Sequence, residues 1–240
     1  MNIFVLTGAG ISAESGLGTF RERGGLWSRF DPARLATPEA FAADPEEVHA
    51  FYNLRRQGVR AAAPNAAHRA LARLQTELAG RGGRLFLCTQ NVDDLHERGG
   101  AAAVVHMHGE ILRACCLACT AATPWAEDLS VATPCPSCGR AGGMRPDVVW
   151  FGEVPLHLDA IEAGLAESDL FVAIGTSGAV YPAAGFVARA RRLGLPTHEI
   201  NLDPSDTADA FDTAAYGPAT ETVPAWVEAV LAGPRPRQGA

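Results

Sequence analysis

The chain has 240 residues, enough to bury a sizeable core as one large domain or slightly more. Its formal net charge of −7 argues against nonspecific nucleic-acid binding, which needs a surplus of basic side chains. Hydrophobic residues make up 48% of the chain, but no apolar run approaches membrane-spanning length, and the N-terminus lacks the pattern of a signal peptide. We therefore expect a cytoplasmic protein that binds neither nucleic acid nor membranes.

Apolar runs and helical patterns alternate along the chain. The apolar runs predict strands at 3–7, 84–88, 103–106, 169–174 and 196–201. Helical periodicity predicts helices at 65–79, 181–193 and 223–231, with Pro224 in the first turn of the last one. This alternation favours an α/β fold in which a parallel sheet is covered by helices on both faces.

A further helix is predicted from Asp44 to about Arg60, with Asp44 as its N-cap, Pro45 at the first position and Glu47 completing a capping box. At about 100° per residue, one face is apolar and holds Val48, Phe51, Tyr52, Leu54, Gly58 and Val59. The opposite face holds His49, Asn53, Arg56, Gln57 and Arg60. Arg55 falls within the apolar face, so it either extends outward, pairs with an internal carboxylate, or binds an acidic ligand.

Polar or glycine-rich loops follow the predicted strands. The first is Gly8-Ala9-Gly10-Ile11-Ser12-Ala13, which has the G-x-G-x-x-A form that brings backbone amides to a pyrophosphate. The others are Thr89-Gln90-Asn91-Val92-Asp93, His106-Met107-His108-Gly109, Gly175-Thr176-Ser177 and Asn201-Leu202-Asp203. The loops could simply be polar, as most loops are, but their position after successive strands favours a dinucleotide-binding crevice.

Two CxxC pairs, Cys116-x-x-Cys119 and Cys135-x-x-Cys138, have the spacing of a zinc ribbon. Four thiolates complete a tetrahedral zinc site and leave no coordination position open, so such a zinc would be structural. Two disulfides, or unrelated surface thiols, are the alternatives. The expected reducing compartment favours zinc.

In combination and order, these motifs resemble the sirtuins, which are NAD-dependent protein lysine deacylases. The resemblance runs from residue 3 to about 231 and rests on Gly8 to Ser12, Thr19-Phe20-Arg21, Thr89 to Asp93, His108-Gly109, the four cysteines and Gly175 to Ser177. The bacterial CobB-type, class III members are also similar at Pro64-Asn65-Ala66-Ala67-His68, Val149-Trp150-Phe151-Gly152-Glu153 and Tyr181-Pro182-Ala183-Ala184-Gly185-Phe186.

The resemblance implies a Rossmann-like NAD-binding domain formed by 1–30, 66–111 and 147–232. It also implies a small helical and zinc-binding domain formed by 31–65 and 112–146, and we expect 233–240 to be a disordered tail. The implied cofactors are NAD and one structural Zn²⁺, and the implied partners are acylated lysine side chains of proteins. We expect the protein to be a monomer.

The resemblance also implies residue roles. The implied cofactor-binding residues are Gly8, Ala9, Gly10, Ser12, Phe20, Arg21, Trp27, Gln90, Asn91, Asp93, Gly175, Thr176, Ser177, Asn201, Leu202, Asp203 and Ala219. Asn91 and Asp93 would hold the nicotinamide end and share catalysis with His108, the general base. If 103–106 is extended, His106 and His108 share a face, so the residues alone leave both as candidates. The choice of His108 follows the family's His-Gly motif.

The implied reaction transfers the acyl group from lysine to ADP-ribose and releases nicotinamide. Tyr52-x-x-Arg55 is similar to the pair with which class III sirtuins bind an acidic acyl group, which implies activity on succinyl-, malonyl- and glutaryl-lysine. The peptide would add as a strand beside Val148-Val149-Trp150-Phe151 and the loop Gly178-Ala179-Val180. The alternatives are a deacetylase in which Arg55 is structural, a mono-ADP-ribosyltransferase, a nicotinamide oxidoreductase and a zinc-ribbon nucleic-acid module.

Overall fold

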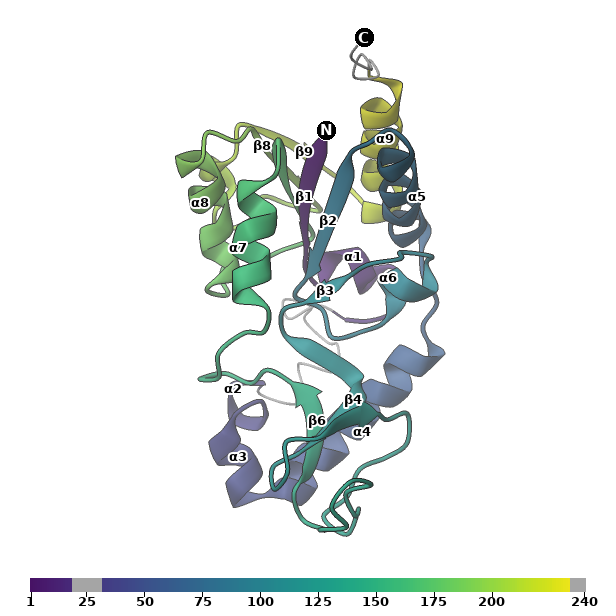
Figure 1. Ribbon diagram of the computed structural model, residues 1–240, viewed down its shortest axis with the longest axis vertical. Coiled ribbons are helices and arrows are strands. Elements are labelled where there is room, and N and C mark those ends of the chain that lie inside the picture. Colours follow the sequence, from purple (N-terminus) through teal and green to yellow (C-terminus); the bar gives the residue numbers. More distant parts are fainter. Residues whose placement is uncertain (19–31, 234–240) are drawn as a thin grey trace.

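The computed structural model describes residues 1–18 and 32–233, except for the side chains of residues 32 and 33. The predicted cofactor-binding residues Phe20, Arg21 and Trp27 lie outside the described residues, as does the predicted tail beyond Gly233. Within the described ranges the chain forms two lobes. The large lobe is built on a parallel sheet, and the small lobe lies beyond the carboxyl ends of the strands β1 and β2 (Figure 1).

The large sheet has six strands in the order β3-β2-β1-β7-β8-β9, and all neighbouring pairs are parallel. These strands are β1 (Asn2–Thr7), β2 (Arg84–Thr89), β3 (Val105–His106), β7 (Leu170–Ile174), β8 (Thr197–Asn201) and β9 (Thr213–Tyr216). The predicted parallel α/β fold is confirmed.

Two strands differ from the prediction. The run 103–106 pairs with β2 only through Val105 and His106, because the backbone N–H groups of Ala102 and Ala103 donate to the Gln75 side chain. Strand β9 was not predicted at all. It is a short edge strand with mostly exposed residues, so it has no apolar run by which a sequence could reveal it.

Helices cover both faces of this sheet, and strand alternation assigns the residues of β1 to one face or the other. Ile3 and Val5 pack in the cluster that includes the apolar residues of α5 and α9. Phe4 and Leu6 pack on the other face with residues of α7 and α8 (Figure 1). The helices of this lobe are α1 (Gly10–Ala13), α5 (Ala66–Gly80), α6 (Leu95–Arg98), α7 (Leu158–Ala166), α8 (Phe186–Arg192) and α9 (Ala219–Ala232), with 3₁₀ turns at Ala183–Gly185 and Ala208–Ala210.

Two predicted helices have other starting points. The helix expected at 181–193 divides into the 3₁₀ turn after Pro182 and the shorter α8. The helix expected at 223–231 begins already at Ala219, after a turn in which Gly217 has φ 149°. Pro224 therefore lies inside α9 rather than in its first turn, where we had placed it.

The small lobe combines helices with a three-stranded antiparallel sheet of order β5-β4-β6. Its elements are α2 (Pro32–Leu35), α3 (Pro38–Ala43), α4 (Pro45–Ala61), β4 (Gly109–Cys116), β5 (Ala122–Pro124) and β6 (Met144–Val148). Phe41, Phe51, Ile111 and Trp150 belong to the core that joins these helices to β4 and the end of β6. The predicted division into domains stays a prediction.

Helix α4 begins as predicted, with the Asp44 side chain accepting a hydrogen bond of 2.9 Å from the backbone N–H of Glu47. Its faces differ from the prediction. Leu54 is 46% exposed, whereas Arg56, assigned to the polar face, is fully buried, and His49 is also buried. The reason is that α4 packs against protein on two sides, so the presumed polar face meets β4 and the loop at Leu129.

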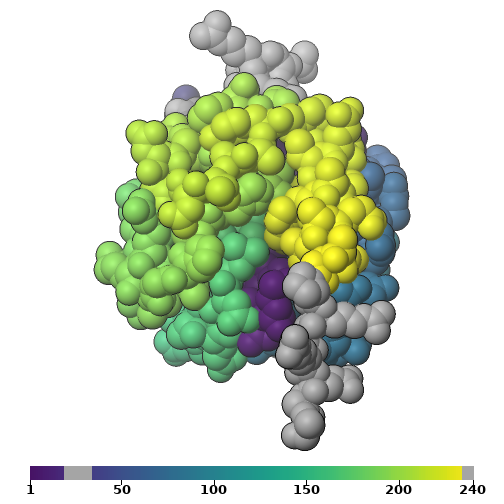
Figure 2. Space-filling model, turned by 90° about the horizontal axis from the view of Figure 1, so that it is seen from above, coloured from purple at the N-terminus to yellow at the C-terminus, as the bar shows by residue number. Residues whose placement is uncertain are grey.

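Among the described residues, no helix is both long enough and apolar enough to cross a membrane. Figure 2 looks onto the end of the large lobe where β1 begins. The purple N-terminal segment is visible there between green segments and the yellow C-terminal helix.

Candidate functional site

The loops that follow the strands of the large sheet meet at its carboxyl edge. The backbone N–H of Gly10 donates to the Gly175 carbonyl at 2.8 Å, and that of Gly8 donates to Ile174 at 2.9 Å. A Cβ on Gly10 would lie 2.6 Å from the Cα of Gly175, and one on Gly8 would lie 2.7 Å from the Gly175 oxygen. Both glycines are therefore needed for the first loop to approach its neighbour, before any cofactor is considered.

Three buried polar side chains form the centre of this edge. The Asn91 amide nitrogen donates to the Gly8 carbonyl at 3.1 Å and to the Ser12 hydroxyl at 3.2 Å. The Ser12 hydroxyl donates in turn to a carboxylate oxygen of Asp93 at 3.1 Å. Burial raises the pKa of Asp93, and hydrogen bonds from Leu95 and Ser12 oppose that shift. The structure thus brings the predicted residues Ser12, Asn91 and Asp93 into direct contact.

Gln90 and Asn201 connect this centre to the next loops along the edge. The Gln90 amide donates to the Thr176 hydroxyl at 3.1 Å, and the Asn201 amide donates to the Thr176 carbonyl at 2.8 Å. The Ser177 carbonyl accepts from the backbone N–H of Asp206 at 2.9 Å. The predicted residues Leu202 and Asp203 lie exposed in the loop after Asn201, on the β8 side of the edge.

The predicted residue Ala219 opens α9 on the other side of the glycine loop. Its neighbour Thr220 donates from both backbone and side chain to the Glu14 carboxylate, at 2.9 and 2.6 Å. This contact holds the beginning of α9 against the end of α1. A row of polar groups therefore extends from Asp93 to α9, as a dinucleotide would require.

The two candidate histidines have different partners. Nδ1 of His108 lies 3.1 Å from the Gln90 carbonyl oxygen, and burial lowers the pKa of this imidazole. Nδ1 of His106 lies 3.2 Å from the Asn91 carbonyl oxygen, and its Nε2 lies 2.7 Å from a carboxylate oxygen of Glu97. A carbonyl accepts only, so Nδ1 of His108 carries the hydrogen and Nε2 keeps the lone pair that a base needs.

Tyr52 and Arg55 lie about one turn apart on α4. The Tyr52 hydroxyl accepts a hydrogen bond of 2.9 Å from Nε1 of Trp150. The Arg55 guanidinium carbon lies 5.6 Å from the Tyr52 ring centroid and 5.7 Å from that of Phe51. Burial lowers the pKa of Arg55, whereas the hydroxyl of Tyr52 and the charge of Asp93 act to raise it. The guanidinium is therefore within electrostatic reach of the Asp93 carboxylate.

The predicted peptide-binding stretch runs from Val148 to Phe151. Val148 is buried, and Phe151 is 48% exposed. The backbone N–H of Val149 donates to the His108 carbonyl, and that of Phe151 donates to the Ala36 carbonyl, both at 2.8 Å. Because these two N–H groups are already bonded, an added peptide strand would pair through other backbone groups of this stretch.

The four predicted metal ligands form one cluster at the far end of β4. Their sulfur atoms all lie within 4.8 Å of one another, with Cys116 and Cys138 at 3.8 Å and Cys119 and Cys135 at 3.7 Å. A tetrahedron with Zn–S bonds of about 2.3 Å has edges of about 3.8 Å, so the arrangement fits zinc. None of the four is in a disulfide, which excludes the two-disulfide alternative in this structure.

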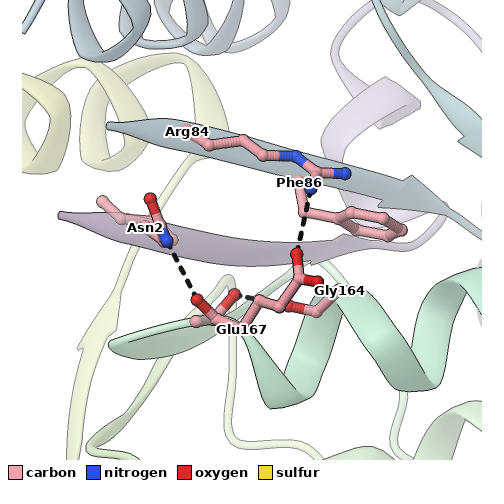
Figure 3. Close-up of a pocket in the computed structure, with 7 residues that line it drawn as sticks. Asn2, Arg84, Phe86, Gly164 and Glu167 are labelled. Atoms are coloured by element: carbon pink, nitrogen blue, oxygen red, sulfur yellow. Dashed lines mark hydrogen bonds and ion pairs between the residues drawn. The ribbon is translucent and has the colours of Figure 1, made fainter. Parts of the chain in front are cut away.

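A depression at the amino end of the sheet is not part of this site. Asn2, Arg84, Phe86, Gly164 and Glu167 line it, and Figure 3 shows Asn2 and Arg84 both directed at Glu167. Its volume of about 10 Å³ holds no more than one water molecule. Polar groups suited to a ligand are instead at the opposite edge.

Sequence reasoning missed His68 and His96 as neighbours of the site. Both are fully buried, with ring centroids 5.0 Å apart. Nε2 of His68 lies 3.4 Å from the Ser12 hydroxyl, and Nε2 of His96 lies 3.0 Å from the Thr7 hydroxyl. The polar sequence Pro64-Asn65 before His68 indicated a helix start but not this contact, which depends on how α5 packs on the sheet.

Taken together, the parallel sheet and the glycine loop at its carboxyl edge are the features of a nucleotide-binding α/β fold, and the four-thiol cluster has the geometry that a structural metal site requires. The chain belongs to the Sir2 family, whose family model matches residues 8–182.

Curated relatives cover almost the whole chain. An NAD-dependent protein deacylase of Caulobacter vibrioides is 60% identical over 97% of this chain and 98% of that protein. One of Escherichia coli K12 is 50% identical over 96% of this chain and 82% of that protein. Among solved structures, a Sir2 homologue in complex with NAD superposes with a TM-score of 0.86 at 39% identity, covering 95% of this chain and 89% of the other.

Proposed function

We propose that this protein removes acyl groups from lysine side chains of proteins and consumes NAD in doing so. The observation that carries the proposal is the buried Ser12–Asn91–Asp93 network at the carboxyl edge of a Sir2 fold, beside His108, whose pKa is lowered by burial. The relatives named as NAD-dependent protein deacylases, and the NAD complex of a Sir2 homologue, support the same activity here.

The residues suit a reaction in which the acyl-lysine carbonyl oxygen attacks the ribose carbon that carries nicotinamide. The positively charged nicotinamide is a good leaving group, so a weak nucleophile suffices if Asn91 and Asp93 hold that end in line. His108 would then accept a proton from a ribose hydroxyl, whose oxygen bonds to the former carbonyl carbon. The lysine nitrogen would leave with that proton as the free amine, and one water molecule would open the remaining cyclic intermediate. The products would be nicotinamide, O-acyl-ADP-ribose and free lysine.

Product analysis tests this proposal. Mass spectrometry of a reaction with an acyl-lysine peptide should find nicotinamide and O-acyl-ADP-ribose in equal amounts, and only when NAD is present. ADP-ribose attached to the peptide or to the enzyme would instead indicate a transferase. A reduced nicotinamide absorbance without release of nicotinamide would indicate an oxidoreductase.

We further propose that acidic acyl groups are preferred, because Arg55 provides a planar cation beside the Tyr52 hydroxyl. A hydrogen bond to a charged group contributes about 1.5–3 kcal/mol, or roughly tenfold to over a hundredfold in rate. Burial strengthens this preference, since a partly buried guanidinium is less hydrated and gains more from a carboxylate partner.

The substitution Arg55→Met should lower kcat/KM for a succinyl-lysine peptide by roughly tenfold to a hundredfold and leave an acetyl-lysine peptide much less affected. The matched control is Arg60→Met, which removes an exposed arginine of the same helix and should change neither value. Equal losses for the two peptides in Arg55→Met would show that Arg55 is structural.

We propose that the cysteine cluster holds one structural Zn²⁺, because its sulfur spacing fits a tetrahedral ion and none of the four thiols is in a disulfide. Thiolate ligands of this kind require a reducing environment, which supports a cytoplasmic location. A metal analysis should find one zinc per chain, and light scattering should give the mass of a monomer.

A further inference from the structure

His106 lies between two groups that can only accept hydrogen bonds. Its Nε2 is 2.7 Å from a carboxylate oxygen of Glu97, and its Nδ1 is 3.2 Å from the carbonyl oxygen of Asn91. A neutral imidazole carries a hydrogen on only one of its two nitrogens, so the lone pair of the other nitrogen would face one of these oxygens. Only the imidazolium, which carries a hydrogen on each nitrogen, satisfies both partners.

His108, two residues further along, is in the opposite situation. Its Nδ1 meets the single acceptor Gln90, and burial lowers its pKa, so the neutral form is favoured. The two histidines therefore contact consecutive carbonyls of one loop, Gln90 and Asn91, in different charge states. Environments that shift the pKa values of two neighbouring titratable groups in opposite directions commonly give the two groups different roles.

The charged groups around His106 favour its protonated form. Burial lowers the pKa of His106, but the hydrogen bond and the charge of Glu97, with a further contribution from Glu110, outweigh it, and the pKa is raised overall. Asp93 interacts electrostatically with His106; burial raises the pKa of Asp93, and the positive imidazole opposes that rise. His96 on α6 also faces it, and its own pKa is lowered mainly by burial.

The carbonyl that His106 contacts belongs to the residue at the centre of the site. The Asn91 backbone N–H donates to the Thr89 hydroxyl at 3.0 Å, and its side chain donates to Gly8 and Ser12. With His106 on its carbonyl, Asn91 is held at its backbone donor, its backbone acceptor and its side chain. Of these contacts to Asn91, only the one from His106 can be removed by a change of pH near neutrality.

We propose that His106, held as an imidazolium by Glu97, is a positioning residue that fixes the Asn91 peptide and thereby sets the loop that carries Asn91 and Asp93. This inference rests on the proposed deacylase function only for its kinetic readout. The charged form exists below the pKa of His106 and is lost as the pH rises through it. Loop order, and with it kcat/KM for NAD, should therefore decline on the alkaline side.

Nitrogen NMR of ¹⁵N-histidine-labelled protein tests the charge state directly, with His106→Gln used to assign the signal. Wild-type His106 should carry hydrogen on both nitrogens at a pH where a free imidazole, with a pKa of about 6.5, is neutral. Glu97→Gln should shift its titration downward by about one pH unit or more. Glu110→Gln removes an equal charge that makes no hydrogen bond to His106, and it should shift the titration much less.

Kinetics supply the second readout. In Glu97→Gln the alkaline limb of the kcat/KM profile for NAD should move to lower pH together with the NMR titration, while the acidic limb, set by His108, stays in place. A wild-type His106 that is neutral near pH 7, or an alkaline limb that does not move, would overturn the proposal. Absence of any turnover in the wild type would refute the proposed function, and the NMR result would still decide the state of His106.

Discussion

At the scale of single residues, the site depends on contacts that a linear sequence does not display. Ser12, Asn91 and Asp93 come from two loops and meet through hydrogen bonds of 3.1 and 3.2 Å. Alternation could not separate His106 from His108, because an extended chain would direct both to the same side. Their partners in the structure distinguish them. Glu97 holds His106 as a cation, whereas His108 contacts the single carbonyl of Gln90 and stays neutral.

The substitution His108→Tyr should reduce deacylation by about 10²- to 10⁴-fold, because the general base is lost, while NAD still binds. In the wild type, burial lowers the pKa of His108, so the base form persists below the ordinary histidine pKa and activity is lost only as the pH falls through that lowered value. A pH profile of kcat/KM together with calorimetric NAD binding checks both statements. Retained turnover in the variant would move the base to another residue.

At the scale of elements, α4 connects Tyr52 and Arg55, the proposed acyl-binding residues, to the module that carries the cysteine cluster. On one side it carries Tyr52 and Arg55. On the other, the Asn53 amide donates to the Leu129 carbonyl at 2.8 Å and accepts from its N–H at 2.9 Å, and Nε of Arg56 donates to the Ile111 carbonyl at 3.0 Å. A buried arginine bonded in this way fixes the helix against β4.

The substitution Arg56→Ala should lower the free energy of unfolding by about 2–4 kcal/mol, because it leaves a cavity and removes the partner of the buried Ile111 carbonyl. Arg60→Ala, on the exposed side of the same helix, should change it by about 0.5 kcal/mol or less. Urea unfolding followed by circular dichroism measures both. Equal effects would contradict the assigned burial of Arg56.

The elements also show how far pattern reasoning reaches. The buried strands β1, β2, β7 and β8 and the helix α5 have strong periodicity and caps, so the sequence predicts them within a few residues. It could not predict β9, which lacks an apolar run, or the burial of Arg56, which depends on the neighbouring module. The cysteine cluster was predictable because the spacing of ligands within each pair is itself the signal.

At the scale of the whole molecule, the cysteine module and α4 form one unit. Leu129 belongs to the cluster with Cys116, Cys135 and Met144 and also receives the Asn53 side chain. Loss of the proposed metal should therefore destabilise α4, although the thiol cluster lies at the far end of β4 from His108.

Removal of zinc with a chelator should unfold the module and raise hydrogen exchange in α4, since a structural zinc supplies about 10–16 kcal/mol in isolated zinc-finger peptides. The large sheet should keep its protection, because its two cores contain no residue of the module. Hydrogen exchange with mass spectrometry, before and after chelation, provides the measurement. Unchanged exchange and an unchanged melting temperature after complete chelation would refute the structural zinc.

The most direct test of the central claim is a competition assay with equal amounts of succinyl-lysine and acetyl-lysine peptides of one sequence, followed by mass spectrometry with and without NAD. The account predicts NAD-dependent loss of both acyl groups, with the succinyl group removed faster because of Arg55. Faster removal of acetyl would contradict the role of the Tyr52–Arg55 pair. Absence of turnover for both peptides would contradict the proposed deacylase function itself.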